Sequence, residues 1–210
     1  MPSHVAQDAD EETVTLYVKY SMDKPSAAFM QMPVFTKAKP SMTKCHVLFD
    51  NLSNNLLNIV SIGMQLPTPL KHVMFLHDAK LVLSVDMESF FMQLFQAAYI
   101  TDFKTYDGSS MGKVHTGRMV QDNSESPAIT QAFLTHMLSN MPQVKMRIMS
   151  YVDNVYLKSL TGNEAEHVND IGHLFCCLSH PNVTMNMIRT FWCANTGVEA
   201  LGHMWSADCT

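Results

Sequence analysis

The sequence lacks the cysteine patterns and apolar runs that mark secreted or membrane proteins. Its five cysteines are odd in number and include no Cys-x-x-Cys pair, so neither a disulfide framework nor a zinc site is favoured. No apolar run is long enough to cross a bilayer, and the first residues form neither a signal peptide nor a lipidation motif. We therefore expect reduced thiols, an intracellular location in the cytoplasm or nucleus, and no membrane partner.

Signatures of several common enzyme classes are missing too. The sequence has no Gly-x-Ser-x-Gly motif and no P-loop, so serine-hydrolase and nucleotide-switch functions lack their residues. Its ten histidines include no pair spaced i, i+4 with a partnering carboxylate, and a helical zinc site is not favoured. What the chain does have is 210 residues, 47% of them hydrophobic, which is enough to bury one sizeable core.

Charge is unevenly spread along the chain, whose formal net charge is −5. Residues 1–18 carry four acidic side chains and no basic one, whereas residues 19–80 carry seven lysines against three aspartates. The remainder is acidic again. The basic portion could contact a polyanion such as nucleic acid. An ordinary solvated surface explains the same lysines equally well.

The spacing of apolar residues and the positions of turn and helix-capping residues predict a chain of mixed helices and strands. Short strands are expected over residues 14–18, 44–49, 81–85, 183–187, 191–193 and 201–205. Helices are expected over residues 70–76, from Pro127 onward, and over residues 164–178. The strand, helix, hairpin, helix, strand order is that of a split-βαβ, ferredoxin-like unit.

Two of these helices have predicted caps and buried faces. Ser124 or Ser126 would cap the helix at Pro127, and Asn163 or Thr161 would cap the last helix. The buried positions expected at helical spacing are Ile129, Phe133, Met137 and Met141 in the first, and Val168, Ile171, Phe175 and Leu178 in the second.

Two strands each deliver an aspartate to what we expect to be one edge of a sheet. Asp153 and Asn154 stand at the tip of a predicted hairpin over residues 148–157, and Asp86 follows the apolar strand that begins at Leu81. Carboxylates gathered in this way can hold a metal ion for phosphoryl transfer. Plain turn chemistry also explains an Asp-Asn pair, so both interpretations stay open at this point.

In order and spacing, these segments resemble the reverse transcriptases of gypsy-type LTR retrotransposons and retroviruses. The resemblance covers roughly residues 31–210. The segments that carry it are 34–58 with 66–69 (fingers), 85–94 (first palm motif), 126–133 (Ser-Pro-Ala-Ile-Thr-Gln at the start of the palm helix), 151–154 (Tyr-Val-Asp-Asn) and 200–208 (Leu-Gly-His of the primer grip).

The resemblance implies a fold class and a domain plan. We expect an α+β fold with reverse-transcriptase-like fingers and palm, a palm with a ferredoxin-like split-βαβ core, and no thumb. Residues 1–30 would form an acidic N-terminal extension, residues 31–80 a fingers-like segment, and residues 81–210 the palm, with a fingers insertion at about 95–125.

The chemistry that the resemblance implies is two-metal nucleotidyl transfer. Asp86 and Asp153 would be catalytic and would hold Mg²⁺, with the neutral Asn154 standing where the family has a second carboxylate. Four further residues match nucleotide-binding positions. They are Phe91, at the aromatic position that excludes the ribose 2′-hydroxyl, Gln121, Lys44 and Arg189.

Several positions depart from the family pattern. Leu48 and Asp50 stand where the fingers strand usually carries Asp and Arg, and Asp122 replaces a glycine after Gln121. Arg189 replaces a lysine that could protonate pyrophosphate, and a guanidinium holds its proton too tightly for that role. Together with Asn154, these changes weaken the site that the resemblance implies.

Two functions follow. The favoured one is a reverse-transcriptase-derived domain with impaired catalysis that serves as a nucleic-acid-binding or protein-interaction subunit. The alternative is an active RNA-directed DNA polymerase that uses Asp86 and Asp153 with Mg²⁺. The expected partners are an RNA/DNA template–primer and either a protein partner or the rest of a larger polyprotein.

Overall fold

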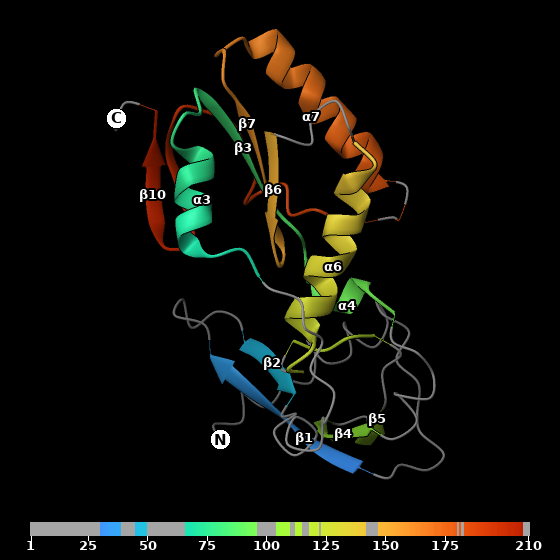
Figure 1. The fold of residues 1–210 in the computed structure, drawn as a ribbon. Coiled ribbons are helices and arrows are strands. Elements are labelled where there is room, and N and C mark those ends of the chain that lie inside the picture. The colour runs from blue at the N-terminus through green and yellow to red at the C-terminus, as the bar shows by residue number, and fades with distance from the viewer. Residues whose placement is uncertain are drawn as a thin grey trace. The chain divides into compact units, whose positions relative to one another are not determined.

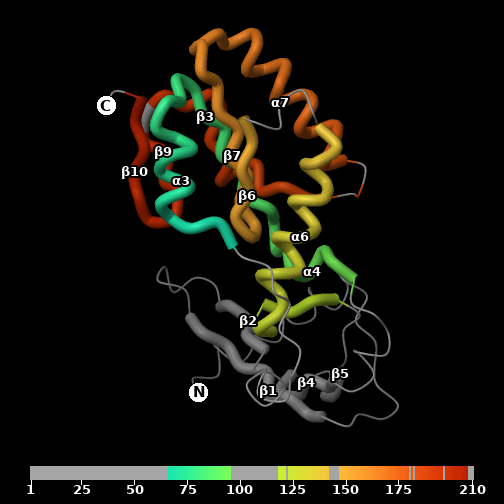
Figure 2. The backbone as a smooth tube through the Cα atoms, viewed as in Figure 1, coloured from blue at the N-terminus to red at the C-terminus, as the bar shows by residue number. Residues whose placement is uncertain are grey.

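The structure is a computed structural model of the 210-residue chain. It describes residues 30–38, 45–49, 66–95, 104–109, 112–114, 118–121, 123–141, 147–179, 181 and 183–207. The chain divides into two compact units: Met1–Ser61 with Phe91–Ser126, and Ile62–Phe90 with Pro127–Thr210. Figure 1 and Figure 2 colour the chain by residue number, and each unit is described by itself below. The predicted strand over residues 14–18 lies outside the described residues.

The first unit contains a four-stranded sheet in the order β2-β1-β4-β5. Its strands are β1 (Met30–Ala38), β2 (Cys45–Phe49), β4 (Lys104–Ser109) and β5 (Gly112–Val114). Strand β1 pairs antiparallel with β2 and parallel with β4. The predicted strand over residues 44–49 is therefore confirmed, one residue shorter at its start.

The second unit is built on an antiparallel sheet in the order β6-β7-β3-β8. Its strands are β3 (Leu81–Asp86), β6 (Ile148–Tyr151), β7 (Asn154–Ser159) and β8 (Phe191–Ala194). Helix α6 (Ser126–Ser139) follows β3 along the chain, after the short helix α4 (Phe90–Gln93), and α7 (Glu164–Ser179) follows β7. This order and topology confirm the α+β, split-βαβ prediction.

Both faces of this sheet are covered, which explains why β3 is apolar at almost every position. Val82 packs with Leu76, Tyr156 and Val198 in one buried cluster. Because side chains alternate along a strand, Leu83 points to the opposite face, and it too is fully buried. Figure 1 shows α6 and α7 on one side of the sheet, with α3 (Pro69–Leu76) and β10 (His203–Ser206) on the other. No helix in the described residues is long and apolar enough to span a membrane.

The buried face of α6 is offset from the predicted one. Thr130, Leu134 and Leu138 are buried, whereas the predicted positions Ile129, Phe133 and Met137 are half-buried, and Met141, just beyond the helix, is buried. The most buried positions of α6 thus lie one residue beyond three of the predicted ones, whereas Met141 is buried as predicted. Ser126 lies inside the helix, and its hydroxyl donates to the Val120 carbonyl.

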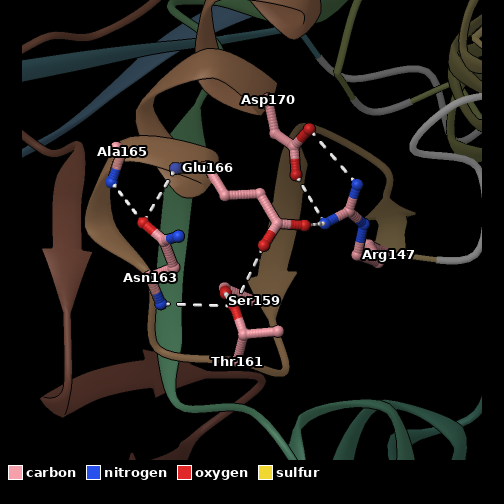
Figure 3. Close-up of polar contacts among 7 residues, drawn as sticks. All are labelled: Arg147, Ser159, Thr161, Asn163, Ala165, Glu166 and Asp170. Carbon is pink, nitrogen blue, oxygen red and sulfur yellow. Dashed lines mark hydrogen bonds and ion pairs between the residues drawn. The ribbon is translucent and has the colours of Figure 1, made fainter.

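Helix α7 begins as predicted, and Ile171 and Leu178 of its predicted inward face are buried. The Asn163 carboxamide oxygen accepts hydrogen bonds from the backbone N–H groups of Ala165 and Glu166, so Asn163 is the N-cap. Figure 3 shows this cap beside the ion pairs of Arg147. The buried residues are His167, Asp170, Ile171, Leu174 and Leu178. Val168 is 57% exposed, so its predicted burial was wrong.

The last predicted strand is the second half of a hairpin. Strand β9 (Thr196–Ala200) pairs with β10 (His203–Ser206) across a turn at Leu201 and Gly202. Both turn residues have positive φ, 51° and 77°, as expected for a tight two-residue hairpin. The predicted strand over residues 183–187 is reduced to one isolated bridge between Met185 and Met87.

Candidate active site

A strained turn presents Asp153. Strands β6 and β7 pair up to Tyr151 and Asn154, which leaves Val152 and Asp153 as the two turn residues. Val152 has φ 54°, in the left-handed region that β-branched residues avoid. The predicted hairpin is confirmed, with two differences: Val152 rather than the Asp-Asn pair takes the left-handed conformation, and Asn154 begins β7 instead of sitting at the tip.

Gln131 of α6 holds this turn through both ends of its carboxamide. Its Oε1 accepts a hydrogen bond from the Val152 backbone N–H at 2.9 Å. Its Nε2 donates to the carbonyl and to the hydroxyl oxygen of Ser150, at 3.2 and 3.0 Å. Gln131 is only 4% exposed, and a buried amide with these partners fixes the backbone next to Asp153. Sequence analysis identified Gln131 as the last residue of the Ser-Pro-Ala-Ile-Thr-Gln motif but assigned it no structural role.

The strand pairing brings Asp86 and Asp153 together along the backbone. Asp86, the last residue of β3, stands opposite Asn154 in the antiparallel register. The backbone N–H of Met87 donates to the Asp153 carbonyl at 2.8 Å. The side chain of Asn154 then donates from Nδ2 to Asp153 Oδ1 at 2.9 Å. The three residues predicted from sequence therefore occupy adjoining positions of one sheet.

The electrostatics of the two aspartates reflect their proximity. Burial raises the pKa of both carboxyl groups, and the charge of Asp86 raises the pKa of Asp153 further. Arg189 opposes the shift, with Nη1 3.7 Å from Asp86 Oδ2, although it is largely solvated. Burial and the same two negative charges raise the pKa of Tyr156 to about 12. Within the described residues, the two aspartates make this site locally negative, and the Arg189 guanidinium lies beside Asp86.

The residues at this sheet edge offer oxygen ligands of the kind that a hard divalent cation takes. Two carboxylates, from Asp86 and Asp153, and one amide oxygen, from Asn154, are the kinds of oxygen ligand that Mg²⁺ takes. Within the part of the chain that the structure describes, no group of three His, Cys, Asp or Glu side chains could hold a metal ion. A pair of ions would therefore have few charged ligands.

The predicted nucleotide-binding residues are spread over both units. Phe91 lies in α4, half-buried, and Gln121 is exposed; both belong to the first unit, whereas Arg189 belongs to the second. Leu48 lies in β2, paired with Phe35. Lys44, Asp50 and Asp122 lie outside the described residues. In the structure Arg189 lies beside Asp86. That the four predicted residues form one nucleotide-binding site stays a prediction.

Comparison with known proteins identifies the fold. No protein-family model and no curated protein matches the sequence. Among solved structures, the foamy viral protease-reverse transcriptase in complex with RNA/DNA hybrid aligns over 98% of this chain and 26% of its own, with 18% identity and a TM-score of 0.83. The protein in complex with double-stranded DNA aligns over 96% and 34%, with 21% identity and a TM-score of 0.81.

A selenomethionine-labelled mutant of the prototype foamy virus enzyme aligns similarly, over 96% of this chain and 26% of its own, with 16% identity and a TM-score of 0.81. The chain thus spans about a quarter to a third of the length of these proteins. These matches confirm the reverse-transcriptase-like fold. The narrower likeness to gypsy-type elements stays a prediction.

Proposed function

We propose that this chain is a reverse-transcriptase-derived domain that binds an RNA/DNA template–primer duplex and is impaired in nucleotidyl transfer. The observation that carries the proposal is the set of groups around the two aspartates. Asp153 accepts a hydrogen bond from Asn154, and Asp86 has Arg189 beside it. Both carboxylates thus have partners within the protein at the place where the resemblance implies Mg²⁺.

The ligands limit what Mg²⁺ could do here. When bound, the metal would activate a primer 3′-hydroxyl and neutralise charge on the departing pyrophosphate. Asp86 and Asp153 would hold it, with Asn154 contributing a neutral oxygen. A Mg²⁺ site relies on few, strongly charged ligands, so exchanging one carboxylate for an amide weakens it. The departures at Leu48, Asp50 and Asp122 would add to this loss at the nucleotide.

Two observations support duplex binding. Two of the similar structures are complexes with double-stranded DNA and with RNA/DNA hybrid. The sequence over residues 19–80 carries seven lysines against three aspartates, and lysines contribute to duplex affinity by releasing counterions from the phosphates. A protein partner, or the rest of a larger polyprotein, would act together with this domain.

The second candidate is an active RNA-directed DNA polymerase. The observation in its favour is the backbone link between Met87 and Asp153, which places the two aspartates at adjoining positions. Two carboxylates at such a spot are the minimum that metal-assisted phosphoryl transfer requires.

Primer extension on an RNA template separates the two candidates. We expect no Mg²⁺-dependent extension by the unmodified chain or by Asn154→Asp, because repairing one part of a catalytic unit leaves the others limiting. Asp153→Asn sets the background. Extension by the unmodified chain would refute impairment, and rescue by Asn154→Asp would place the defect at that residue alone.

A further inference from the structure

The guanidinium of Arg189 lies beside Asp86, one of the two candidate metal ligands. Its Nη1 is 3.7 Å from Asp86 Oδ2, and 72% of the Arg189 side chain is exposed, against 21% of the Asp86 side chain. A guanidinium keeps its positive charge throughout the physiological pH range. The chain therefore places a permanent cation of its own next to the carboxylate that the proposed function assigns to Mg²⁺.

The backbone that leads to Arg189 is hydrogen-bonded to the end of β3 and to the residues after it. The Asn186 N–H donates to the Asp86 carbonyl at 2.8 Å, and the Glu88 N–H donates to the Thr184 carbonyl at 3.0 Å. Both bonds hold this part of the backbone against the strand end that carries the aspartate.

Asn186 also forms the turn that carries Arg189. The Arg189 N–H donates to the Asn186 carbonyl at 3.1 Å and to the Asn186 side-chain Oδ1 at 3.3 Å. The Thr190 hydroxyl donates to the same carbonyl at 2.9 Å. An asparagine that accepts from the backbone of its own turn restricts the conformation of the residues that follow it. The long arginine side chain thus extends from a fixed point close to Asp86.

The charge of Arg189 acts on both candidate ligands. Burial raises the pKa of Asp86 and of Asp153, whereas the positive charge of Arg189 lowers the pKa of each. A cation that favours the ionised carboxylates in this way also repels a second cation that binds to them. Because an exposed ion pair is weak, Mg²⁺ can displace the guanidinium, but at a cost in metal affinity.

We propose that Arg189 competes with Mg²⁺ for Asp86 and thereby lowers the affinity of this site for divalent metal ions. The proposal rests on the proposed function, because it takes Asp86 and Asp153 as the metal ligands. It gives a second cause of weak metal binding, besides the neutral amide of Asn154. The two causes differ in that removing the arginine charge relieves only the competition.

Titration of the full chain with Mg²⁺ tests the competition without a measurement of activity. Binding is followed by NMR through the backbone amide shifts of Asp153 and Asn154. Arg189→Gln removes the charge at an exposed position, and we expect Mg²⁺ to bind about threefold to tenfold more tightly, because charges a few ångström apart interact even in water. Arg189→Lys keeps the charge and should bind Mg²⁺ as weakly as the unmodified chain does.

Lys80→Gln is the matched control. It removes the same charge from the residue before β3, at the end of the strand opposite to Asp86, roughly 20 Å away along the strand. Because this separation exceeds the screening length of about 10 Å in about 0.1 M salt, the Mg²⁺ affinity of Lys80→Gln should equal that of the unmodified chain.

Four results would overturn the proposal: unchanged Mg²⁺ affinity in Arg189→Gln, an equal gain in Lys80→Gln, an equal gain in Arg189→Lys, or no Mg²⁺ binding by any of these chains. Its failure is distinguishable from that of the proposed function. Primer extension by the unmodified chain would refute impaired catalysis whatever the Mg²⁺ affinities are, and equal affinities would leave the impairment in place.

Discussion

Val152 adopts a backbone conformation that a β-branched residue normally avoids, and Gln131 is the side chain that offsets its cost. The left-handed conformation costs on the order of 1–3 kcal/mol, and the Val152 N–H, bonded to Gln131 Oε1, contributes to holding it. The position of Asp153 therefore depends on a residue in a different element.

Replacing Gln131 with methionine should loosen this turn. Gln131→Met keeps the length of the side chain but removes its bonds to Val152 and Ser150, and we expect a loss of about 1–3 kcal/mol in the free energy of unfolding. Hydrogen exchange of the Val152 amide should quicken more than the stability loss alone explains. Thr135→Ala is the comparison, since it removes only the long hydrogen bond that Gln131 Nε2 donates to the Thr135 hydroxyl at 3.4 Å and leaves the bonds to Val152 and Ser150 in place. Unchanged Val152 protection in Gln131→Met would contradict the assigned role.

Asp153→Asn should stabilise the protein near neutral pH. The folded-state pKa of Asp153 is raised by burial and by Asp86, so the folded chain holds this proton more tightly than the unfolded chain. Stability therefore falls as pH rises from the unfolded pKa through the folded one. Removing the charge should add up to about 1 kcal/mol at pH 7, after allowance for solvent screening.

Thermal unfolding across a pH series checks this sign. The advantage of Asp153→Asn over the unmodified chain should shrink as pH falls below the normal range of a carboxyl group, where both are neutral. An advantage that grows in acid would mean that Asp153 is stabilised as the anion.

At the scale of elements, the N-cap of α7 is the clearest single contribution. Asn163→Ala removes the acceptor for two backbone N–H groups, and we expect a loss of about 1 kcal/mol in the free energy of unfolding. Asn163→Asp keeps the acceptor and should cost little or add stability, because a negative charge favours a helix start. Chemical denaturation measures both. Equal losses in the two variants would contradict the capping role.

Local signals predicted the elements well. Pro127 and Asn163 mark helix starts, and the apolar run at Leu81 marks a strand, because these features act within a few residues. The split-βαβ order followed from the sequence of elements, and the matches to solved structures agree with it. Asp86, Asp153 and Asn154 were placed together from the same reasoning.

Features that depend on distant contacts were not predictable. The most buried face of α6 lies one residue beyond the predicted one, because Thr130 and Gln131 are buried there. Val168 stayed exposed, while the polar His167 and Asp170 of α7 are buried, the latter paired with Arg147. The final strand is the second half of a hairpin whose turn residues, Leu201 and Gly202, have positive φ. The burial of α6 and α7 depends on contacts with residues far along the chain, and periodicity does not reveal them.

At the scale of the whole molecule, the chain combines a reverse-transcriptase-like fold with a net charge of −5. A duplex would approach an acidic protein, so its affinity must come from where the lysines lie rather than from the total. The lysines over residues 19–80 are the expected source. Lys37→Gln combined with Lys44→Gln should weaken binding about fivefold or more, whereas Lys145→Gln, outside residues 19–80, should change it little.

The central claim is that the chain binds template–primer duplex, and equilibrium binding of a fluorescent RNA/DNA hybrid to the full chain tests it most directly. Anisotropy is measured in a series of salt concentrations. We expect saturable binding whose affinity falls at least about tenfold between roughly 50 and 200 mM salt, because contacts to phosphates release counterions. Absence of binding at the lowest salt, or an affinity that does not change with salt, would contradict it.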